Sequence, residues 1–467
     1  MSRIVIIGGG PAGYEAALVA AQLGAEVTVV ERDGLGGSCV LSDCVPSKTF
    51  IASSDARTAF SLAGTLGIDA GPTAAIGVNA PAIHGRVKAL ALAQSADVGR
   101  QLSRVGVEVV TGVARLAETG ATRRHPVEIT DSGTGAVATV EADVVLIATG
   151  ATPRVLPPAR PDGERILDWR QLYDLPALPE RLVVVGSGVT GAEFASAYLA
   201  LGVPVTLVSS RDRVMPGEDS DAAALIEEVF TRRGMTILAR ARARAVRRSS
   251  DGVVVQLADG RVVEASHALM AVGSVPNTAG LGLESAGVAL GPGGFVAVDR
   301  VSRTDVPGIY AAGDVTGVLM LASVAAMQGR IAMWHALGEA VAPLRLQTVS
   351  ANVFTSPEIA TVGIGQVTVD AGLVLARTVK LPLATNARAK MAGITDGFVK
   401  LFCRPSSGLV IGGVVVAPRA SELILPIALA VENHLSVGQI AHTISIYPSL
   451  SGSLTETARQ LMQHEFD

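Results

Sequence analysis

Two segments of the chain repeat one pattern of apolar and polar positions. In the first, a β-branched run at residues 3–7 leads into a glycine-rich turn, an Ala/Leu-rich stretch up to Gly24 and a second apolar run at 27–30. In the other, an apolar run at 182–185 leads into a similar turn, an Ala-rich stretch and an apolar run at 205–208. Short β-branched runs are typical of buried strands, and longer Ala-rich stretches are typical of helices. Each segment is therefore predicted to form strand, tight turn, helix and strand.

The first glycine-rich turn has the G-x-G-x-x-G spacing, with Gly8, Gly10 and Gly13. This spacing lets the backbone bend sharply, approach a pyrophosphate at a helix N-terminus and pack that helix close to the sheet. The following strand ends in Glu31, the acidic residue expected to bind a ribose diol. A glycine-rich turn alone is also common as plain structural punctuation, but strand, helix and terminal acid in register predict a dinucleotide site.

The second turn repeats the spacing with Gly186, Gly188 and Gly191, so a second dinucleotide is expected. Its second strand leads to Ser209 and Arg211 and lacks the terminal acid. A carboxylate there would repel a 2′-phosphate, whereas an arginine attracts one. NADPH is therefore favoured over NADH, which stays possible, and the alternative is that Arg211 and the nearby Arg213 simply face water.

Two of the three cysteines, Cys39 and Cys44, are separated by only four residues. A bond between them would close a very small loop and restrain little of the unfolded chain, so it suits redox chemistry better than structural stapling. A close pair beside a β-α-β pattern is typically catalytic or metal-binding. A four-thiolate zinc site is excluded by the count, and no histidine neighbours the pair, so no metal is expected. Cys403 lies in an apolar run and is expected in the core.

Composition agrees with a large α/β enzyme. At 467 residues the chain is too long for one core and suits two or three domains. The hydrophobic share is 49% and the mean hydropathy +0.43, yet no apolar run is long enough to span a bilayer. A net charge of −4 gives no nucleic-acid footprint. The apolar N-terminus is broken by glycines too early for a signal peptide, so a cytoplasmic location is expected.

With these motifs the chain resembles the pyridine nucleotide-disulfide oxidoreductases, the family of lipoamide dehydrogenase, glutathione reductase and mercuric reductase. Within the family it is most similar to actinobacterial lipoamide-dehydrogenase-like quinone reductases. The resemblance covers nearly the whole chain, because further motifs follow in family order: Ile147–Gly150, Gly273–Asn277, Gly308–Asp314 and Phe354–Glu358.

The resemblance implies that FAD occupies the first turn, with Glu31 at its adenosine ribose and Asp314 at its ribityl or pyrophosphate region. It implies that Cys44 faces the flavin as a thiolate and that Cys39 exchanges with a disulfide substrate. A helix N-terminus and a nearby cation would favour such a thiolate.

Lys48 is implied to lie near flavin N5, paired with Glu193, where its charge would stabilise reduced flavin. For FAD, the implied contacts are Gly8, Gly10, Pro11, Ala12, Gly13, Glu31, Gly37, Ser38, Lys48, Gly112, Thr149, Gly150, Gly313, Asp314, Leu321 and Ala322. For NAD(P), they are Gly186, Gly188, Val189, Thr190, Glu193, Ser209, Arg211 and Gly273.

The chain departs from the family at its C-terminal acid–base pair. Tyr447 stands where the family has histidine, and Gly452 where it has glutamate. Histidine exchanges protons near neutral pH, whereas tyrosine, with a pKa near 10, is a poor substitute. Ser274 and Ser323 also replace family residues, an arginine and a histidine, which leaves detailed nucleotide contacts open. The histidines nearby are interpreted as structural or surface residues: His434, His442 and His464.

Two Rossmann-like domains and a C-terminal α+β domain are expected. The tail has β-branched runs at 397–401 and 409–416 and then apolar helices through Val431, and in this family it makes a homodimer. The predicted division is an FAD domain at 1–155 and 275–345, an NAD(P) domain at 156–274 and an interface domain at 346–467.

The preferred interpretation is an FAD-dependent NAD(P)H oxidoreductase that passes electrons to quinones, because this transfer needs no protonated thiol leaving group. The alternative is a lipoamide or other low-molecular-weight disulfide reductase, for which the intact cysteine pair argues. A flavin-bearing subunit without catalysis is a third possibility. The catalytic candidates are Cys39, Cys44, Lys48, Glu193 and Tyr447.

Overall fold

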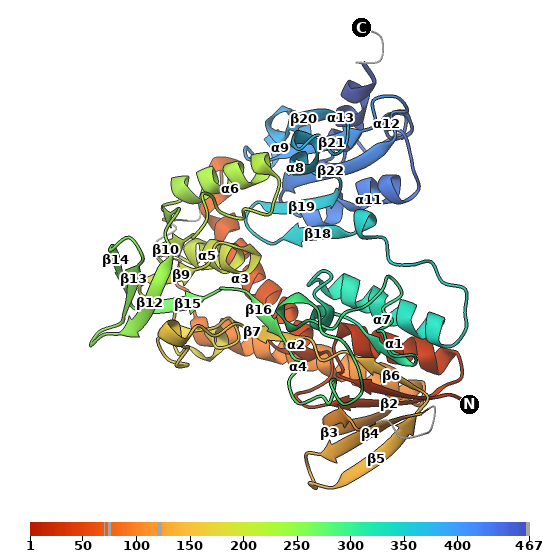
Figure 1. The fold of residues 1–467 in the computed structure, drawn as a ribbon. Helices are drawn as coiled ribbons and strands as arrows, with labels where there is room; N and C mark the ends of the chain where they lie inside the picture. Colours follow the sequence, from red (N-terminus) through yellow and green to blue (C-terminus); the bar gives the residue numbers. More distant parts are fainter. Residues whose placement is uncertain (70, 73–75, 119–123, 464–467) are drawn as a thin grey trace. The chain divides into compact units, whose positions relative to one another are not determined.

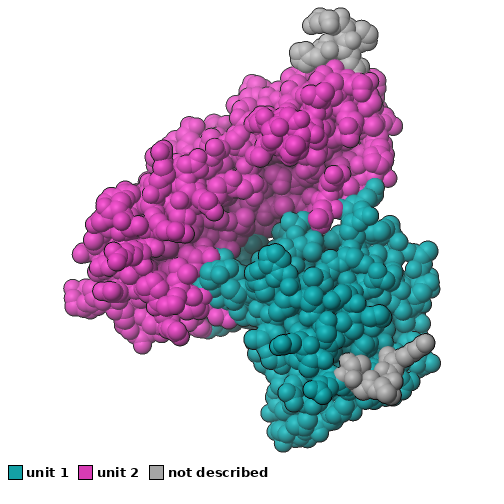
Figure 2. Space-filling view, in the orientation of Figure 1, with its two compact units in different colours: residues 1–49, 84–154, 273–345 teal, residues 50–83, 155–272, 346–467 magenta. Residues whose placement is uncertain are grey.

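The computed structural model describes residues 1–69, 71–72, 76–118 and 124–463 (Figure 1). His464 lies outside them, so its interpretation is not tested. By their contacts, residues 1–49, 84–154 and 273–345 form one compact unit, and residues 50–83, 155–272 and 346–467 form a second (Figure 2). Contacts thus define two units, and the division into FAD, NAD(P) and interface domains stays a prediction.

A mixed seven-stranded sheet runs through the described part of the first unit. At its centre β1 (Arg3–Ile7) pairs in parallel with β2 (Glu26–Glu31) and β6 (Val144–Ile147). Their valines and isoleucines are buried, as in parallel sheets that are covered on both faces. The order is β17-β6-β1-β2-β3-β4-β5, where β3 is Glu108–Leu116, β4 His125–Asp131, β5 Val137–Ala142 and β17 Ile309–Ala311.

Helices α1 (Pro11–Gln22) and α7 (Ala322–Ala336) pack closely against each other in this unit (Figure 1). A Cβ on Gly329 would lie 2.1 Å from the carbonyl oxygen of Ala12, so only glycine permits this approach. The border between the two units falls inside two long helices, between residues 49 and 50 and between residues 83 and 84. The remaining elements of this part are α2 (Gly37–Leu41), α3 (Cys44–Leu62), α4 (Ala80–Arg104), β7 (Ala151–Pro153) and β16 (Ser274–Pro276).

The second unit contains the second predicted β-α-β segment. Its five-stranded sheet has the order β11-β10-β9-β15-β8, and every neighbouring pair is parallel. A three-stranded antiparallel sheet of β12, β13 and β14 accompanies it. The bounds are β8 Ile166–Leu167, β9 Leu182–Val185, α5 Val189–Ala200, β10 Val205–Val208, α6 Ser220–Arg232, β11 Thr236–Leu238, β12 Ala243–Arg248, β13 Val253–Leu257, β14 Val262–Ala265 and β15 His267–Met270.

The C-terminal part of the second unit is an antiparallel sheet with helices, ordered β18-β19-β22-β21-β20. The predicted apolar runs form β21 (Phe398–Cys403) and β22 (Val410–Ala417), and Cys403 is fully buried as expected. The α/β fold class predicted from the sequence is confirmed. The other bounds are β18 Ser350–Val353, β19 Glu358–Gly363, α8 Gln366–Asp370, β20 Arg377–Pro382, α9 Ala387–Met391, α10 Ala420–Leu423, α11 Leu425–Glu432, α12 Val437–Ala441 and α13 Gly452–Gln463.

None of the helices in the described ranges is long and apolar enough to cross a membrane.

Candidate functional site

The first glycine turn joins β1 to α1 in the geometry that its spacing predicts. Gly8 has φ +107°, and a Cβ on it would lie 2.3 Å from the carbonyl oxygen of Ala148. A Cβ on Gly13 would lie 1.9 Å from the carbonyl oxygen of Gly8. A side chain at Gly8 would therefore collide with the backbone that follows β6, and one at Gly13 would push α1 away from the end of β1. The close approach leaves the N-terminus of α1 facing the turn.

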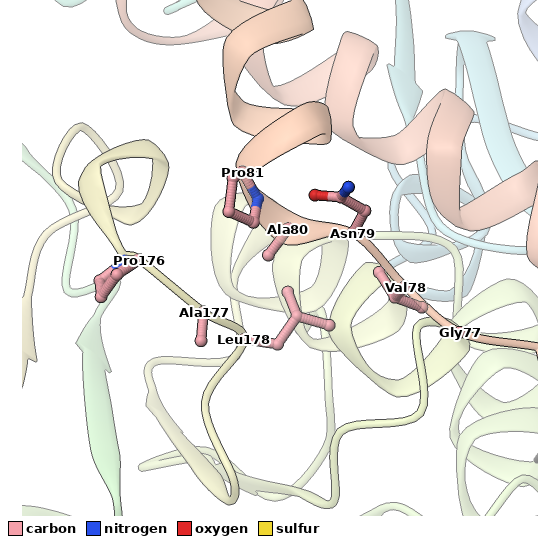
Figure 3. Close-up of a pocket in the computed structure, with 8 residues that line it drawn as sticks. All are labelled: Gly77, Val78, Asn79, Ala80, Pro81, Pro176, Ala177 and Leu178. Atoms are coloured by element: carbon pink, nitrogen blue, oxygen red, sulfur yellow. The ribbon is translucent and has the colours of Figure 1, made fainter.

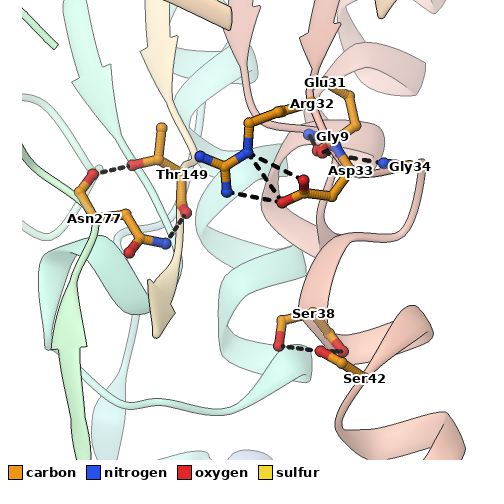
Figure 4. A network of polar contacts seen from close by, with 9 residues as sticks. All are labelled: Gly9, Glu31, Arg32, Asp33, Gly34, Ser38, Ser42, Thr149 and Asn277. Atoms are coloured by element: carbon orange, nitrogen blue, oxygen red, sulfur yellow. Dashed lines mark hydrogen bonds and ion pairs between the residues drawn. The ribbon is translucent and has the colours of Figure 1, made fainter. Parts of the chain in front are cut away.

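Glu31 ends β2 and is fixed beside this turn (Figure 4). Its Oε2 accepts a hydrogen bond from Gly9 N at 2.6 Å, and its Oε1 accepts from Asp33 N at 2.7 Å and from Gly34 N at 3.3 Å. The carboxylate thus stands at the carboxyl end of the strand, next to the glycine turn. This is the location that a ribose-binding acid requires, and ribose binding by Glu31 stays a prediction.

Cys39 lies in α2 and Cys44 is the first residue of α3, so the short connection between the two helices keeps the thiols close to each other. Both are free thiols, partly buried, and hydrogen-bonded to each other. That hydrogen bond lowers the pKa of Cys39, assisted by Lys48 and opposed by burial. The same bond and burial raise the pKa of Cys44. Within the pair, Cys39 is therefore the more acidic thiol and Cys44 the less acidic one.

The lower pKa falls on Cys39, whereas the resemblance assigns the thiolate to Cys44 beside the flavin. The N-terminus of α3 favours a thiolate on Cys44, but the hydrogen bond between the thiols opposes it. Tyr14 also belongs to this neighbourhood: burial, Glu15 and Cys39 raise its pKa. Sequence reasoning missed Tyr14, although its place directly after Gly13 was a usable signal.

Asp314 follows Gly313 at the start of the short 3-10 turn Asp314–Thr316. Burial and the charge of Asp43 raise its pKa to about 6. The preceding turn is held by Gln328, whose fully buried Oε1 accepts from Gly313 N at 2.9 Å. Sequence reasoning did not single out Gln328, which lies fifteen residues further on, in α7.

We expect Asp314→Asn to stabilise the FAD-stripped protein in a pH-dependent way. Because the folded pKa of about 6 exceeds the reference value of 3.8, the native state prefers the protonated acid. Its stabilising contribution is complete below pH 3.8 and is lost as pH rises through 6. The free-energy advantage of the variant should therefore grow from near zero at acid pH to roughly 3 kcal/mol above neutrality. The measurement is the urea midpoint of both proteins across this range.

The matched control is Glu284→Gln, an exposed carboxylate of the same unit. Its difference from the parent protein should stay flat with pH. A flat difference for Asp314→Asn as well would contradict the expectation.

Two segments of the first unit, each close in sequence to a point where the chain passes between the units, are joined by a reciprocal pair of hydrogen bonds (Figure 4). Thr149 Oγ1 donates to the carbonyl oxygen of Asn277 at 2.8 Å, and Asn277 Nδ2 donates to the carbonyl oxygen of Thr149 at 2.8 Å. Gly150 continues this corner with φ +67°. Both motifs are visible in the sequence, but their reciprocal pairing is not.

The second glycine turn, between β9 and α5, repeats the geometry of the first. Gly186 has φ +113°, and a Cβ on it would lie 2.1 Å from the carbonyl oxygen of Ala271. A Cβ on Gly191 would lie 1.8 Å from the carbonyl oxygen of Gly186, whereas a Cβ on Gly188 would meet no described atom within 4 Å. The turn can thus receive a second pyrophosphate beside Gly188.

Glu193, one turn into α5, is buried and held by the C-terminal part of its own unit. Its Oε1 accepts from Phe354 N at 2.9 Å. One turn further along, Ser196 Oγ accepts from Ser356 N at 3.2 Å. The segment after β18 therefore fixes the face of α5 that carries Glu193. The expected pairing of Glu193 with Lys48 stays a prediction.

Tyr447 is 84% exposed, and its apolar neighbours Ile444 and Ile446 are 98% and 80% exposed. His442 is exposed as well. Tyr447 is thus not enclosed within its own unit, and an acid–base role for it stays a prediction.

The predicted contacts fall in the two units as follows. The first unit holds Gly8, Gly10, Pro11, Ala12, Gly13, Glu31, Gly37, Ser38, Cys39, Cys44, Lys48, Gly112, Thr149, Gly150, Gly273, Gly313, Asp314, Leu321 and Ala322, with Gly112 inside β3 and Leu321 just before α7. The second holds Gly186, Gly188, Val189, Thr190, Glu193, Ser209, Arg211 and Tyr447.

A separate hollow of about 530 Å³ lies in the second unit (Figure 3). Its described lining comprises residues 77–81 and 176–178, which include none of the predicted site residues. The polar side chain among them, Asn79, accepts from Ala82 N at the start of α4. The described residues that line this hollow include no titratable or nucleophilic side chain.

The fold and the two glycine turns are those expected of an oxidoreductase that binds two dinucleotides, and the comparison with known protein families agrees. Residues 2–329 match the model described as pyridine nucleotide-disulphide oxidoreductase, and residues 349–458 match the dimerisation domain of the same family. The chain belongs to this family, which implies FAD and a pyridine nucleotide as cofactors. The backbone at Gly10 and Gly188, where an added Cβ would meet no atom closer than 4.0 Å, is open to a pyrophosphate, so both turns fit these groups.

Relatives cover the whole chain. A protein of Mycobacterium tuberculosis named NAD(P)H dehydrogenase (quinone) is 61% identical over 100% of this chain and 95% of its own. A dihydrolipoyl dehydrogenase of Haloferax volcanii is 34% identical over 99% and 96%. The crystal structure of LpdA from M. tuberculosis superposes with a TM-score of 0.95 at 61% identity, covering 99% of this chain and 100% of that one.

Proposed function

We propose that this protein is an FAD-dependent NAD(P)H oxidoreductase that transfers electrons from NADPH to quinones. Two observations together carry the proposal. Both glycine turns have the geometry of the G-x-G-x-x-G motif, and Tyr447 and Gly452 replace the acid–base pair of the family. The 61% identical relative that is named as a quinone dehydrogenase supports it.

Each part of the chain has a role in this reaction. The N-termini of α1 and α5 bind the two pyrophosphates, and Glu31 orients the first nucleotide through its ribose. FAD bound at the first turn would supply the redox chemistry, since a flavin can take up a hydride from NADPH and pass its two electrons, singly or together, to a quinone. Lys48 supplies positive charge beside the flavin, and Glu193, fixed by Phe354 N, positions the nicotinamide side.

The second candidate is a reductase for lipoamide or another small disulfide. The hydrogen-bonded Cys39–Cys44 pair favours it, because the interaction with Cys44 lowers the pKa of the Cys39 thiol. Such a reaction needs a proton donor for the departing thiolate, and Tyr447 or water would have to supply it.

The deciding experiment measures NADPH oxidation by the purified yellow protein with a naphthoquinone, oxidised lipoamide and glutathione disulfide in parallel. Turnover with the quinone alone supports the proposal. Turnover with a disulfide at a comparable rate would replace it with the second candidate.

Cys39→Ser separates the two candidates within one protein. We expect quinone turnover to stay within about twofold of the parent rate, since neither thiol takes part in transfer from flavin to quinone. Any disulfide turnover should disappear, because Cys39 is the exchanging thiol. A loss of quinone turnover beyond about tenfold would show that the thiols carry the electrons.

We also propose that the protein is a homodimer through its C-terminal domain. The family model for residues 349–458 supports this, as do the exposed side chains of Leu425, Leu429, Ile444 and Ile446. The cytoplasmic location stays a prediction from the sequence.

A further inference from the structure

Three loops gather at one edge of the parallel sheet in the second unit. The order β11-β10-β9 places the carboxyl ends of these strands side by side. The turn after β9 carries Gly186 and Gly188, the turn after β10 spans residues 209–213, and the turn after β11 spans residues 239–241. Dinucleotides lie outside the carboxyl ends of such strands. A ligand with its pyrophosphate at Gly188 therefore directs its adenosine toward the other two turns.

Backbone hydrogen bonds tie the turn after β11 to the turn after β10. Arg240 N donates to the carbonyl oxygen of Arg211 at 2.7 Å, and Ala241 N donates to that of Ser209 at 2.7 Å. Arg240 has φ +52°, a left-handed conformation that is unfavourable for a residue with a side chain. The two arginines are thus held at neighbouring positions by the backbone itself.

Ser209 occupies the strand end where NAD-binding relatives of this fold place an acid. It is fully buried, and its hydroxyl contacts Ser187 Oγ at 2.7 Å and the carbonyl oxygens of Arg211 and Arg213 at 3.2 and 3.1 Å. Arg211 N donates to the same hydroxyl at 3.1 Å. The Ser209 hydroxyl therefore stabilises the backbone of the turn, and the strand end carries no negative charge from this residue.

The resulting surface carries excess positive charge. Arg211 and Arg240 are exposed, and neither guanidinium has a carboxylate partner among the residues that the structure describes. Arg213 reaches Asp212 only at 4.0 Å. Guanidinium groups bind phosphate through two parallel hydrogen bonds, so two of them at adjacent positions fit a phosphate monoester.

We propose that Arg240, together with Arg211, binds the 2′-phosphate of NADPH, which makes Arg240 a specificity-determining residue. This inference rests on the proposed use of a pyridine nucleotide at the second turn. Sequence reasoning pointed only to the arginines in the turn after β10, above all Arg211, because Arg240 lies 29 positions later and its proximity comes from strand pairing.

Calorimetric titration of the FAD-loaded protein with adenosine 2′,5′-bisphosphate and with 5′-AMP tests the proposal without turnover. We expect Arg240→Ala to raise the Kd for the bisphosphate by about tenfold or more, the loss expected for hydrogen bonds to a charged group. The Kd for 5′-AMP should change by less than about twofold. Arg247→Ala, an exposed arginine of β12, is the control and should change neither.

Arg240→Lys keeps the positive charge but lacks the planar guanidinium, so its Kd for the bisphosphate should fall between those of the parent and the alanine variant. Such an intermediate Kd would also show that the loss in Arg240→Ala does not come from a folding defect. Equal losses for both ligands, or an unchanged Kd for the bisphosphate, would overturn the proposal. The outcome is independent of the quinone assay, so a parent protein that ignores quinones but shows these Kd changes refutes the proposed acceptor alone.

Discussion

Gly191→Ala is expected to lower NADPH-dependent quinone turnover by about a hundredfold or more. The new Cβ would lie 1.8 Å from the carbonyl oxygen of Gly186, and that neighbour is backbone rather than a flexible side chain. Helix α5 must therefore move away from β9, and it takes its N-terminus and Glu193 with it. A displacement of about 1 Å in a positioning element costs about a hundredfold in rate.

Two further glycines of the same unit make this prediction specific. Gly217→Ala meets no described atom within 4 Å of its new Cβ and should behave like the parent protein. Gly188→Ala is equally uncrowded in the protein, so α5 should keep its place and the melting temperature should hold. Its methyl group would instead meet the pyrophosphate, which should raise the Kd for NADP+.

The readouts are flavin absorbance, which reports the first nucleotide site, the rate of flavin reduction by NADPH, and the melting temperature. Gly191→Ala should retain FAD, because the first turn belongs to the other unit. Normal flavin reduction in Gly191→Ala would contradict the idea that the close helix contact positions the site.

Local features of the sequence were sufficient to predict the backbone geometry of both glycine turns. The spacing of Gly8 and Gly13 predicted the contact that a Cβ would destroy, because a sharp turn before a helix demands glycine at fixed offsets. The end of the strand at Glu31 was equally predictable from a short apolar run that stops at an acid.

Contacts between distant segments escaped prediction. Glu193 is held by Phe354, 161 positions away, and the donor is a backbone N–H that every residue except proline possesses. Arg240 reaches Arg211 through the pairing of β10 with β11, which no motif announces. The inclusion of residues 50–83 in the second unit follows from α3 and α4 running across the border, which local patterns do not reveal.

Lys400, in the core of the second unit, makes another contact between distant segments that the sequence did not predict. It sits in an otherwise apolar strand, yet its side chain is only 2% exposed. Its Nζ lies 2.9 Å from Asp219 Oδ2 and 2.8 Å from Asp221 Oδ2. Asp219, whose side chain is also 2% exposed, additionally caps α6 by accepting from Asp221 N and Ala222 N. One buried ion pair therefore links β21 to the start of α6.

We expect Lys400→Met to reduce the free energy of unfolding of this unit by roughly 3–5 kcal/mol, because it leaves the Asp219 carboxylate buried without a countercharge. Lys380→Met is the matched control. Lys380 pairs with Asp221 at 2.7 Å but is 44% exposed, so its loss should cost less than about 1 kcal/mol. Amide hydrogen exchange in α6 measures both changes within the intact protein.

The double variant Lys400→Met/Asp219→Asn then separates charge burial from packing. Asparagine keeps the helix cap but removes the stranded charge, so it should recover more than half of the lost protection in α6. If the double variant is no more protected than Lys400→Met, the loss comes from the methionine itself. If Lys400→Met matches Lys380→Met, the buried pair contributes no more than a surface contact.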